Sequence, residues 1–433
     1  MRAIVNDRAR LQRMLDFESA LTRAEAALGA VPASVVEPID AACRAELYDI
    51  AALGESAARA GDIAAPIVSA LAAEVAKTDA QAAAYVHWGA GAQDVIDTAL
   101  VIELRAAIDA LTSDLNRATD AFIALGGRQR RTASVARVFL RHALPMPFGL
   151  KAAGYAAALG RARERLRRVR RECLVLQFGG SAGTLAALGD RALNVSERLA
   201  ALLDLPAPEA PWHSHRDRLG EVAAALAIMV GTCGKIARDM SLLMQTEIGE
   251  AFEPAPRNDA AILPQERHLP AMALTAAALA PQLLATILGA GMQEHERSGL
   301  QAEWSSFPAL VLAASGAIGT VADMAQGVEV DADRMRSNLD ATQGRVMAEA
   351  VVAALAAKIG YGEARKLVEE ANQKAVAEKR SLQNVLADDA RVGAHLAGPA
   401  LGRLFEPMSY QGAAQTFIDR LVGTVKSSTS KRV

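Results

Sequence analysis

The sequence has few aromatic residues, few cysteines and almost no net charge. Only 4% of its 433 residues are Phe, Trp or Tyr, although 52% are apolar, so small and aliphatic side chains supply the apolar content. This composition favours closely packed helices over sheets. It excludes a β-sandwich and a disordered chain. Three cysteines, with no Cys-x-x-Cys pair, give no basis for a disulfide framework or a thiolate zinc site.

The charge balance limits the kind of partner. The chain has 47 Lys and Arg residues against 49 Asp and Glu residues, a net charge of −2, with both signs interspersed. This distribution excludes a basic nucleic-acid-binding surface and a polybasic membrane patch. We therefore expect a small-molecule partner, with no nucleic acid and no membrane.

Two segments bear on cellular location. The first residues lead into an amphipathic pattern that contains acids, so we predict no signal peptide and a cytoplasmic protein. Residues 269–293 form the longest stretch that contains no charged residue. Because they include Pro270 and Pro281 and are rich in alanine, we predict a buried helix of a bundle.

Helical spacing dominates the chain. Its clearest example has apolar residues three or four positions apart, at Leu104, Ile108, Leu111, Leu115, Ala118, Phe122 and Leu125. Similar spacing recurs at 11–28 and 219–247, whereas alternation of strand length is almost missing. We predict an all-α fold with an N-terminal domain (1–100), a central long-helix bundle (101–345) and a C-terminal domain (346–433). At the turn after His87, Asp94 is expected to cap the following helix.

The rare residues cluster at helix breaks. All three tryptophans lie in segments that also carry histidine, which favours a functional role for the set over isolated structural histidines. His213 and His215 diverge on a helix, and no His-Glu-x-x-His motif completes a metal shell. Gly179–Gly183 lacks the spacing of a phosphate loop, and no Gly-x-Ser-x-Gly motif supports a serine nucleophile. Acid–base or anion chemistry by His, Arg and Glu remains.

Seven segments in order carry a resemblance to a known family: Val86–Asp97, Leu140–Pro145, Leu176–Asp190, Pro211–Arg218, Gly234–Asp239, Leu243–Glu247 and Gln293–Arg297. Over essentially the whole chain the sequence resembles the 3-carboxy-cis,cis-muconate cycloisomerases of the fumarase/aspartase superfamily. The resemblance implies three helical domains, a homotetramer whose sites are shared between subunits, and no metal or organic cofactor. It also implies addition or elimination at a carbon–carbon double bond beside a carboxylate.

The sequence departs from the family pattern at residues that would bind substrate or move the proton. In the first segment, Gly91 and Ala92 stand at two positions where the family has hydroxyl side chains. At Arg137–Arg141, which leads into the second segment, Val138 replaces a threonine and Arg141 replaces a glutamine. In the family's signature loop, Ala260 and Ala261 replace two serines, one of them the family's general base. Glu266 replaces a lysine and His268 an asparagine in the same loop. The family's proton-abstraction mechanism cannot therefore operate unchanged.

The resemblance and the departures together give the predicted site. Its catalytic candidates are His142, His213, Glu266 and His268, and its substrate-binding candidates are His87, Arg141, Ser214, Arg216, Gln245, Arg267, His295 and Arg297. Three interpretations stay open. The chain is an enzyme with altered catalytic residues, an inactive paralogue that keeps the fold for assembly or regulation, or a lyase with a different substrate.

Overall fold

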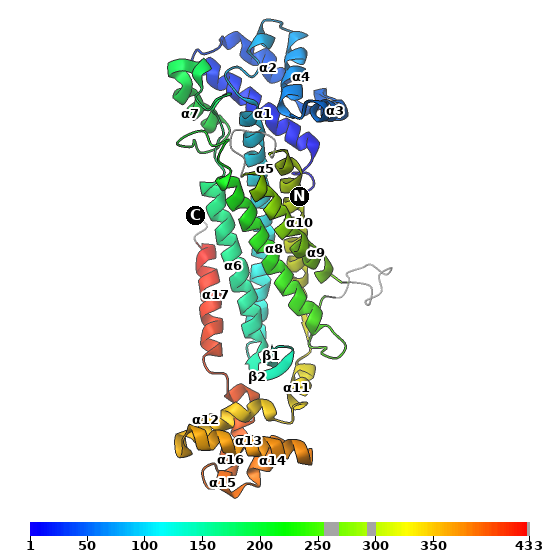
Figure 1. Cartoon of the computed structure of the whole chain (residues 1–433), viewed down its shortest axis with the longest axis vertical. Helices are drawn as coiled ribbons and strands as arrows, with labels where there is room; N and C mark the ends of the chain where they lie inside the picture. The colour runs from blue at the N-terminus through cyan, green and yellow to red at the C-terminus, as the bar shows by residue number, and fades with distance from the viewer. Residues whose placement is uncertain (255–267, 292–299, 431–433) are drawn as a thin grey trace. The chain divides into compact units, whose positions relative to one another are not determined.

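The computed structural model describes residues 1–254, 268–291 and 300–430. Seventeen α-helices and two short two-stranded sheets account for the regular structure of the described residues, which confirms the all-α prediction. Figure 1 shows the helices and strands. In the first half they are α1 Asp7–Ala27, α2 Val36–Ala42, α3 Ile50–Ala60, α4 Ala64–Ala76, α5 Ala92–Arg128, β1 Ala133–Val138, β2 Arg141–Pro147, α6 Phe148–Glu172 and α7 Ala192–Leu202. In the second half they are α8 Asp217–Leu243, β3 Ala251–Phe252, α9 Pro270–Ala290, α10 Gln301–Gln326, β4 Glu329–Val330, α11 Ala332–Asp340, α12 Ala348–Ile359, α13 Tyr361–Glu378, α14 Leu382–Ala387, α15 Ala390–Gly393, α16 Gly398–Leu404 and α17 Ala414–Ser430.

Helix α5 confirms the most regular sequence pattern. Its 37 residues include all seven apolar positions from Leu104 to Leu125, and each of those side chains is buried. Burial of one helix face supplies most of the stability of such a helix, because propensity alone contributes little. The pattern predicted over 219–247 corresponds to α8, which ends at Leu243.

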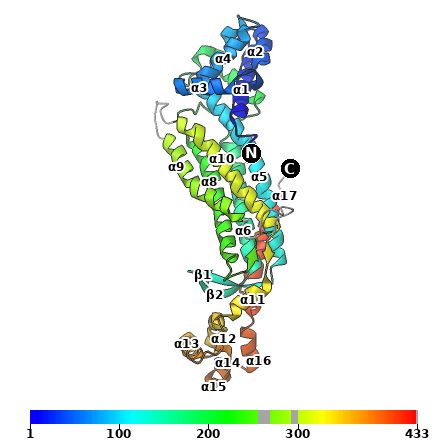
Figure 2. The same cartoon turned by 90° about the vertical axis from the view of Figure 1, so that its right-hand side faces the viewer.

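The chain divides into two compact units, and five helices (α5, α6, α8, α9 and α10) contribute residues to both. The first unit comprises Met1–Asp114, Ala162–Gly231 and Thr275–Ile318. Within it, α1, α2 and α4 surround a core that includes Leu15, Ile39 and Leu71, and α7 packs against α1 (Figures 1 and 2). The three-domain division predicted from the sequence stays a prediction.

The second unit comprises Leu115–Arg161, Thr232–Leu274 and Gly319–Val433. Its helices α12 to α16 share a core that includes Val351, Leu367 and Leu386. The same unit contains the antiparallel hairpin β1–β2, whose first strand packs against α11 (Figure 1). This hairpin was not predicted from the sequence.

Among the described residues, three helices are long and apolar enough to cross a membrane by length and composition alone: Asp217–Leu243, Pro270–Ala290 and Gln301–Gln326. Of these, only the stretch that contains α9 stands out in the sequence by its lack of charge. The prediction of a buried helix is wrong for the single chain, because only 22% of the most apolar stretch of α9 is buried, against 61% for α8 and 50% for α10. The apolar surface of α9 lies outside the core of one chain.

Candidate active site

The turn before α5 is fixed by Asp94. Gly91 precedes the helix, and Asp94, three residues later, accepts a hydrogen bond from the Gly91 N–H at 2.9 Å. Asp94 therefore caps the helix, as predicted, and it does so from the first turn, as the second half of a capping box. The same carboxylate accepts the N–H groups of Gly179 and Gly180 at 2.9 and 2.8 Å. It ties two segments of the first unit together.

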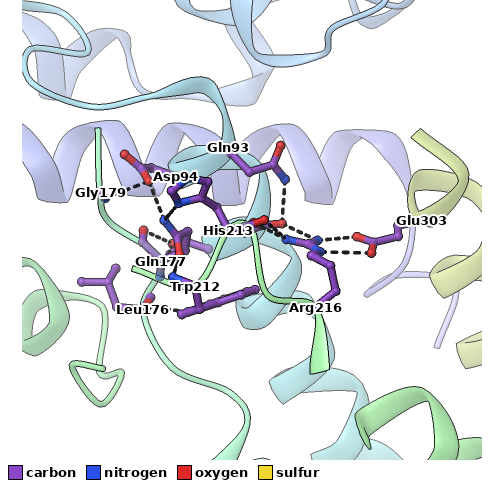
Figure 3. Close-up of polar contacts among 11 residues, drawn as sticks. Gln93, Asp94, Leu176, Gln177, Gly179, Trp212, His213, Arg216 and Glu303 are labelled. Carbon is purple, nitrogen blue, oxygen red and sulfur yellow. Dashed lines mark hydrogen bonds and ion pairs between the residues drawn. The ribbon is translucent and has the colours of Figure 1, made fainter. Parts of the chain in front are cut away.

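Gln177 determines which ring nitrogen of His213 carries the hydrogen. Its side-chain oxygen accepts a hydrogen bond from the backbone N–H of Trp212 at 2.7 Å, which fixes the orientation of the Gln177 amide. Its nitrogen then donates to Asp94 at 2.9 Å and lies 3.3 Å from Nδ1 of His213 (Figure 3). Since an amide nitrogen can only donate, Nδ1 of His213 accepts. The neutral ring therefore carries its hydrogen on Nε2, which makes His213 a donor.

Ser214 follows His213 and is exposed, and its hydroxyl has no partner among the described residues. Across from it, the 179–185 loop approaches closely. A β-carbon on Gly183 would lie 3.1 Å from Cε1 of His213, so the loop packs directly on the imidazole. Trp212 donates its indole N–H to the carbonyl of Leu176 at 2.9 Å and anchors the segment. His213 and Ser214 thus form a rigid, partly exposed edge.

Arg216 does not have the substrate-binding role predicted for it. Asp97 accepts from both terminal nitrogens of its guanidinium, at 2.6 and 2.8 Å. Glu303 accepts from Nε at 3.1 Å and also from Nη2, and the guanidinium carbon lies 5.5 Å from the centre of the Trp212 ring (Figure 3). With the carbonyl of His213 as a further acceptor, all five donors are taken. Arg216 is a buried structural cation.

The second unit places Arg141 and His142 on strand β2. Both side chains are exposed, and Arg141 has no charged partner within the described ranges. His142 pairs in register with Arg137 of β1. Burial and the Arg137 cation lower the pKa of His142, so its ring is neutral at neutral pH.

Arg137 itself is held by a buried acid. Its guanidinium makes a two-pronged contact with Glu250, at 2.8 and 2.5 Å, and Asn338 donates to the same carboxylate at 2.7 Å. The paired geometry fixes the hairpin against the segment after α8. Arg137 is positioned by protein groups, whereas Arg141 remains available for an anion.

Gln245 lies in the turn after α8. Arg334 of α11 clamps this turn by donating to the carbonyls of Ile248 and Glu247, both at 3.0 Å. The amide of Gln245 is exposed and has no side-chain partner in the described part of the chain. His268 is also exposed, and its Nε2 lies 3.2 Å from the hydroxyl of Ser241.

The predicted site therefore falls into two groups within the described residues. His87, His213 and Ser214 belong to the first unit, while Arg141, His142, Gln245 and His268 belong to the second. Four further predicted residues lie outside the described residues: Glu266, Arg267, His295 and Arg297. The substituted signature-loop positions Ala260 and Ala261 lie outside them as well. Among described side chains, no group of three or more His, Cys, Asp or Glu residues is placed to hold a metal ion.

Two buried acids of α1 were missed by the sequence analysis. Glu18 contacts His87, with Oε1 2.6 Å from Nδ1, and Glu25 lies one heptad further along the helix. The signal was available, because Leu11, Glu18 and Glu25 are seven residues apart on a helix face that is otherwise apolar. An acid at such a position is buried and needs a specific role.

The comparisons with known proteins agree with this architecture. Residues 1–267 match the family described as lyase, and residues 344–421 match the adenylosuccinate lyase C-terminus. The chain is 59% identical to a 3-carboxy-cis,cis-muconate cycloisomerase of Bradyrhizobium diazoefficiens over 98% of its own length and 96% of the relative. A cycloisomerase of the same name from Pseudomonas aeruginosa is 49% identical over 97% of the chain and 93% of the relative.

A solved structure gives the same result. The crystal structure of 3-carboxy-cis,cis-muconate lactonizing enzyme from Pseudomonas putida superposes with a TM-score of 0.94 at 47% identity, covering 99% of this chain and 97% of that one. Sequence and fold agree over nearly the full length. The chain therefore belongs to the lyase family, in the 3-carboxy-cis,cis-muconate cycloisomerase branch of the fumarase/aspartase superfamily.

Proposed function

We propose that the chain is a cycloisomerase that forms a lactone from a small polycarboxylate of the 3-carboxy-cis,cis-muconate class. The observation that carries the proposal is the set of donors without an acid partner, on Arg141, His213 and Ser214 in the described chain. The neighbouring cations Arg137 and Arg216 are by contrast neutralised by protein carboxylates. Uncommitted donors are what a substrate with several carboxylates requires.

The reaction needs one bond-forming step and one proton. An oxygen of one substrate carboxylate adds to an alkene carbon, and a proton is delivered to the neighbouring carbon that bears another carboxylate. Before the proton arrives, negative charge collects on that second carboxylate. Fixed donors aimed at this charge lower the barrier, typically by a few kcal/mol for each donor.

The structure supports distinct roles for the histidines and arginines. His213 carries its hydrogen on Nε2 and suits the developing negative charge as a donor. His142 has a lowered pKa and is neutral at neutral pH, so it must first take up a proton from solvent, which the imidazolium then readily gives to carbon; in the reverse direction the neutral ring accepts the proton. Arg141 supplies a fixed positive charge. Glu266 and His268 remain further proton-transfer candidates.

We further propose a homotetramer in which each site combines residues of several subunits. The described site residues are divided between the two units of the chain, and α9 exposes Leu279 and Leu288. Exposed apolar surface of this kind is typical of a subunit interface. We retain the predictions of a cytoplasmic protein without metal or organic cofactor.

A spectroscopic assay tests the proposed activity. Addition of the protein should make the ultraviolet absorbance of 3-carboxy-cis,cis-muconate decay as the conjugated diene is lost. Arg141→Ala should slow the decay at least tenfold, whereas Arg131→Ala, at an exposed arginine before the hairpin, should leave it unchanged. Equal rates for the two variants would contradict the role of Arg141.

The two alternatives have different outcomes in the same assay. An inactive paralogue gives no decay at high protein concentration, and it is favoured by Ala260 and Ala261 at the family's serine positions. Restoring both serines together with Glu266→Lys would then be expected to produce turnover. A lyase with another substrate gives no decay with the muconate but acts on other small dicarboxylates.

A further inference from the structure

Helix α1 buries two glutamates directly beneath the turn that begins at His87. Glu18 is 1% exposed and Glu25 is 0% exposed, and the two lie on the same face of the helix. Neither oxygen of Glu25 has a hydrogen-bond partner within the described part of the chain, and the same holds for Oε2 of Glu18. A buried ionised carboxylate without partners is very unfavourable, so this pair needs an explanation.

Glu18 is committed to His87. Its Oε1 lies 2.6 Å from Nδ1 of the imidazole, and an ionised carboxylate can only accept, so Nδ1 carries a hydrogen. The His87 backbone has a φ of 61°, a left-handed conformation that side chains other than glycine seldom adopt.

Nε2 is then the second donor of the His87 ring. It has no partner among the residues that the structure describes, and the side chain is 16% exposed. A protonated imidazole in this arrangement presents one N–H to Glu18 and the other to an incoming anion. This arrangement resembles the carboxylate-histidine pairs that orient a ring by holding one of its nitrogens.

Glu25 lies against the next glycine of the turn. A β-carbon on Gly89 would be in van der Waals contact with Oε1 of Glu25, at 3.5 Å, and would crowd Cδ2 of Leu188, at 3.1 Å; the φ of 71° also favours glycine here. Burial and the neighbouring charge of Glu18 raise the pKa of Glu25 to about 8. The side chain therefore keeps its proton at neutral pH.

We propose that Glu18 and Glu25 are positioning residues for substrate binding by His87. Glu18 holds Nδ1 and leaves Nε2–H for a substrate carboxylate, while Glu25 fills the space under the turn as a neutral acid. The inference deepens the proposed function and rests on it for the identity of the anion. The two acids touch His87 and its turn, and they do not touch the reacting atoms.

The charges around His87 agree with a protonated ring. Burial alone would lower the pKa of His87, but the contact with Glu18, together with the charges of Asp94 and Asp62, raises it above its ordinary value. For Glu25 the one charged neighbour that shifts its titration is Glu18. If Glu25 were ionised, two negative charges would lie together under the turn.

Histidine NMR on the substrate-free protein tests the pair. With Cε1-labelled histidine, and His87→Gln to assign the resonance, His87 should titrate above the ordinary value of about 6.5. In Glu18→Gln the titration should move down by at least one pH unit. In Glu37→Gln, at an exposed acid of α2, it should not move. A wild-type His87 that titrates below 6 would overturn the proposal even if no variant could be made.

Glu25→Gln tests the proton on the second acid. The folded protein holds this proton up to about pH 8, whereas an unfolded glutamate releases it near 4.5. Wild type therefore loses stability as pH rises from about 5 to 8, and a glutamine does not. The melting temperature of Glu25→Gln relative to that of wild type should therefore rise across this pH range, and the difference should stay constant above it. A constant difference would overturn the protonated state.

Activity measurements separate this inference from the proposed function. Glu18→Gln should raise KM more than it lowers kcat, and the alkaline limb of kcat/KM should move to lower pH. If no substrate is turned over, the proposed function fails, while the NMR titration still decides the positioning role. If turnover is seen and its pH profile is the same in Glu18→Gln, the positioning role fails alone.

Discussion

At the start of α5, Gly91 packs against the backbone of Gly180. A β-carbon on Gly91 would lie 2.7 Å from the carbonyl oxygen of Gly180 and 3.2 Å from the nitrogen of Ser181. Both contacts are with backbone, which cannot rotate away as a side chain can. The residue that the family resemblance places at a hydroxyl position therefore has no room for a side chain in this structure.

Gly91→Thr should destabilise the first unit. The new side chain forces a backbone shift, and overpacking of this kind typically costs about 1–3 kcal/mol. Thermal unfolding should show a melting temperature several degrees lower. Ala92→Ser is the matched control, because Ala92 is only half-buried at the first turn of α5, and it should melt close to wild type. If both variants melt like wild type, the close approach of Gly180 does not exist in solution.

The residue types of the site were predictable from the sequence, but their partners were not. The chain shows Arg137, Arg141 and Arg216 as similar cations beside histidines. Only the structure separates them, since Arg137 meets Glu250 and Arg216 meets Asp97 and Glu303, all distant in sequence. Whether a charge is free depends on contacts that local patterns do not encode.

Among the elements, the β1–β2 hairpin has an unusual tip. Its two-residue connection consists of Phe139 and Leu140, with φ values of 50° and 61°, and these side chains are 94% and 83% exposed. A two-residue hairpin loop with two positive φ values normally uses Asn-Gly. Here two large apolar residues have strained left-handed backbone conformations, and their side chains are exposed to solvent. Both features are unfavourable in a single chain.

Replacing the tip by Asn-Gly should therefore stabilise the hairpin. Phe139→Asn with Leu140→Gly relieves two left-handed residues at about 1 kcal/mol each, and the melting temperature of the second unit should rise. Phe139→Ala with Leu140→Ala removes the same apolar surface without relieving the backbone, and it should give little or no gain. An equal rise in melting temperature in the two double variants would show that the exposed apolar surface, and not the backbone strain, destabilises the tip.

The long helices were predictable and the hairpin was not. In α5, seven apolar residues repeat at helical spacing over three heptads, a signal that few other structures produce. Residues 133–138 alternate only weakly, and Phe139–Leu140 gives none of the turn chemistry by which hairpins are usually found. The division into two units was also hidden, because each unit joins segments that are more than a hundred residues apart.

At the scale of the whole molecule, the apolar surface outside the core is the main feature. Large aliphatic side chains are exposed on three long helices of the first unit, at Ile228 of α8, Leu279 and Leu288 of α9, and Leu312 of α10. Such surface on a single chain is usually covered by another protein surface. This surface agrees with the proposed tetramer. A subunit interface on α9 would account for a helix that is very apolar in sequence but largely unburied in one chain.

Light scattering should find four copies of the 45.4 kDa chain. Leu279→Glu combined with Leu288→Glu should shift the mass to smaller species, because each copy would place uncompensated charge in an apolar interface. Leu193→Glu, at an exposed apolar residue of α7, should leave the mass unchanged. A wild-type monomer would contradict the tetramer and the shared sites together.

The contact of Gly91 with Gly180 also constrains which side chain position 91 can hold. A single substitution that places a hydroxyl at position 91 meets the Gly180 carbonyl first, so it costs stability before any gain in binding is possible. The 178–185 segment has to move before position 91 can change. A side chain at position 91 therefore requires a compensating displacement of the backbone at Gly180 and Ser181.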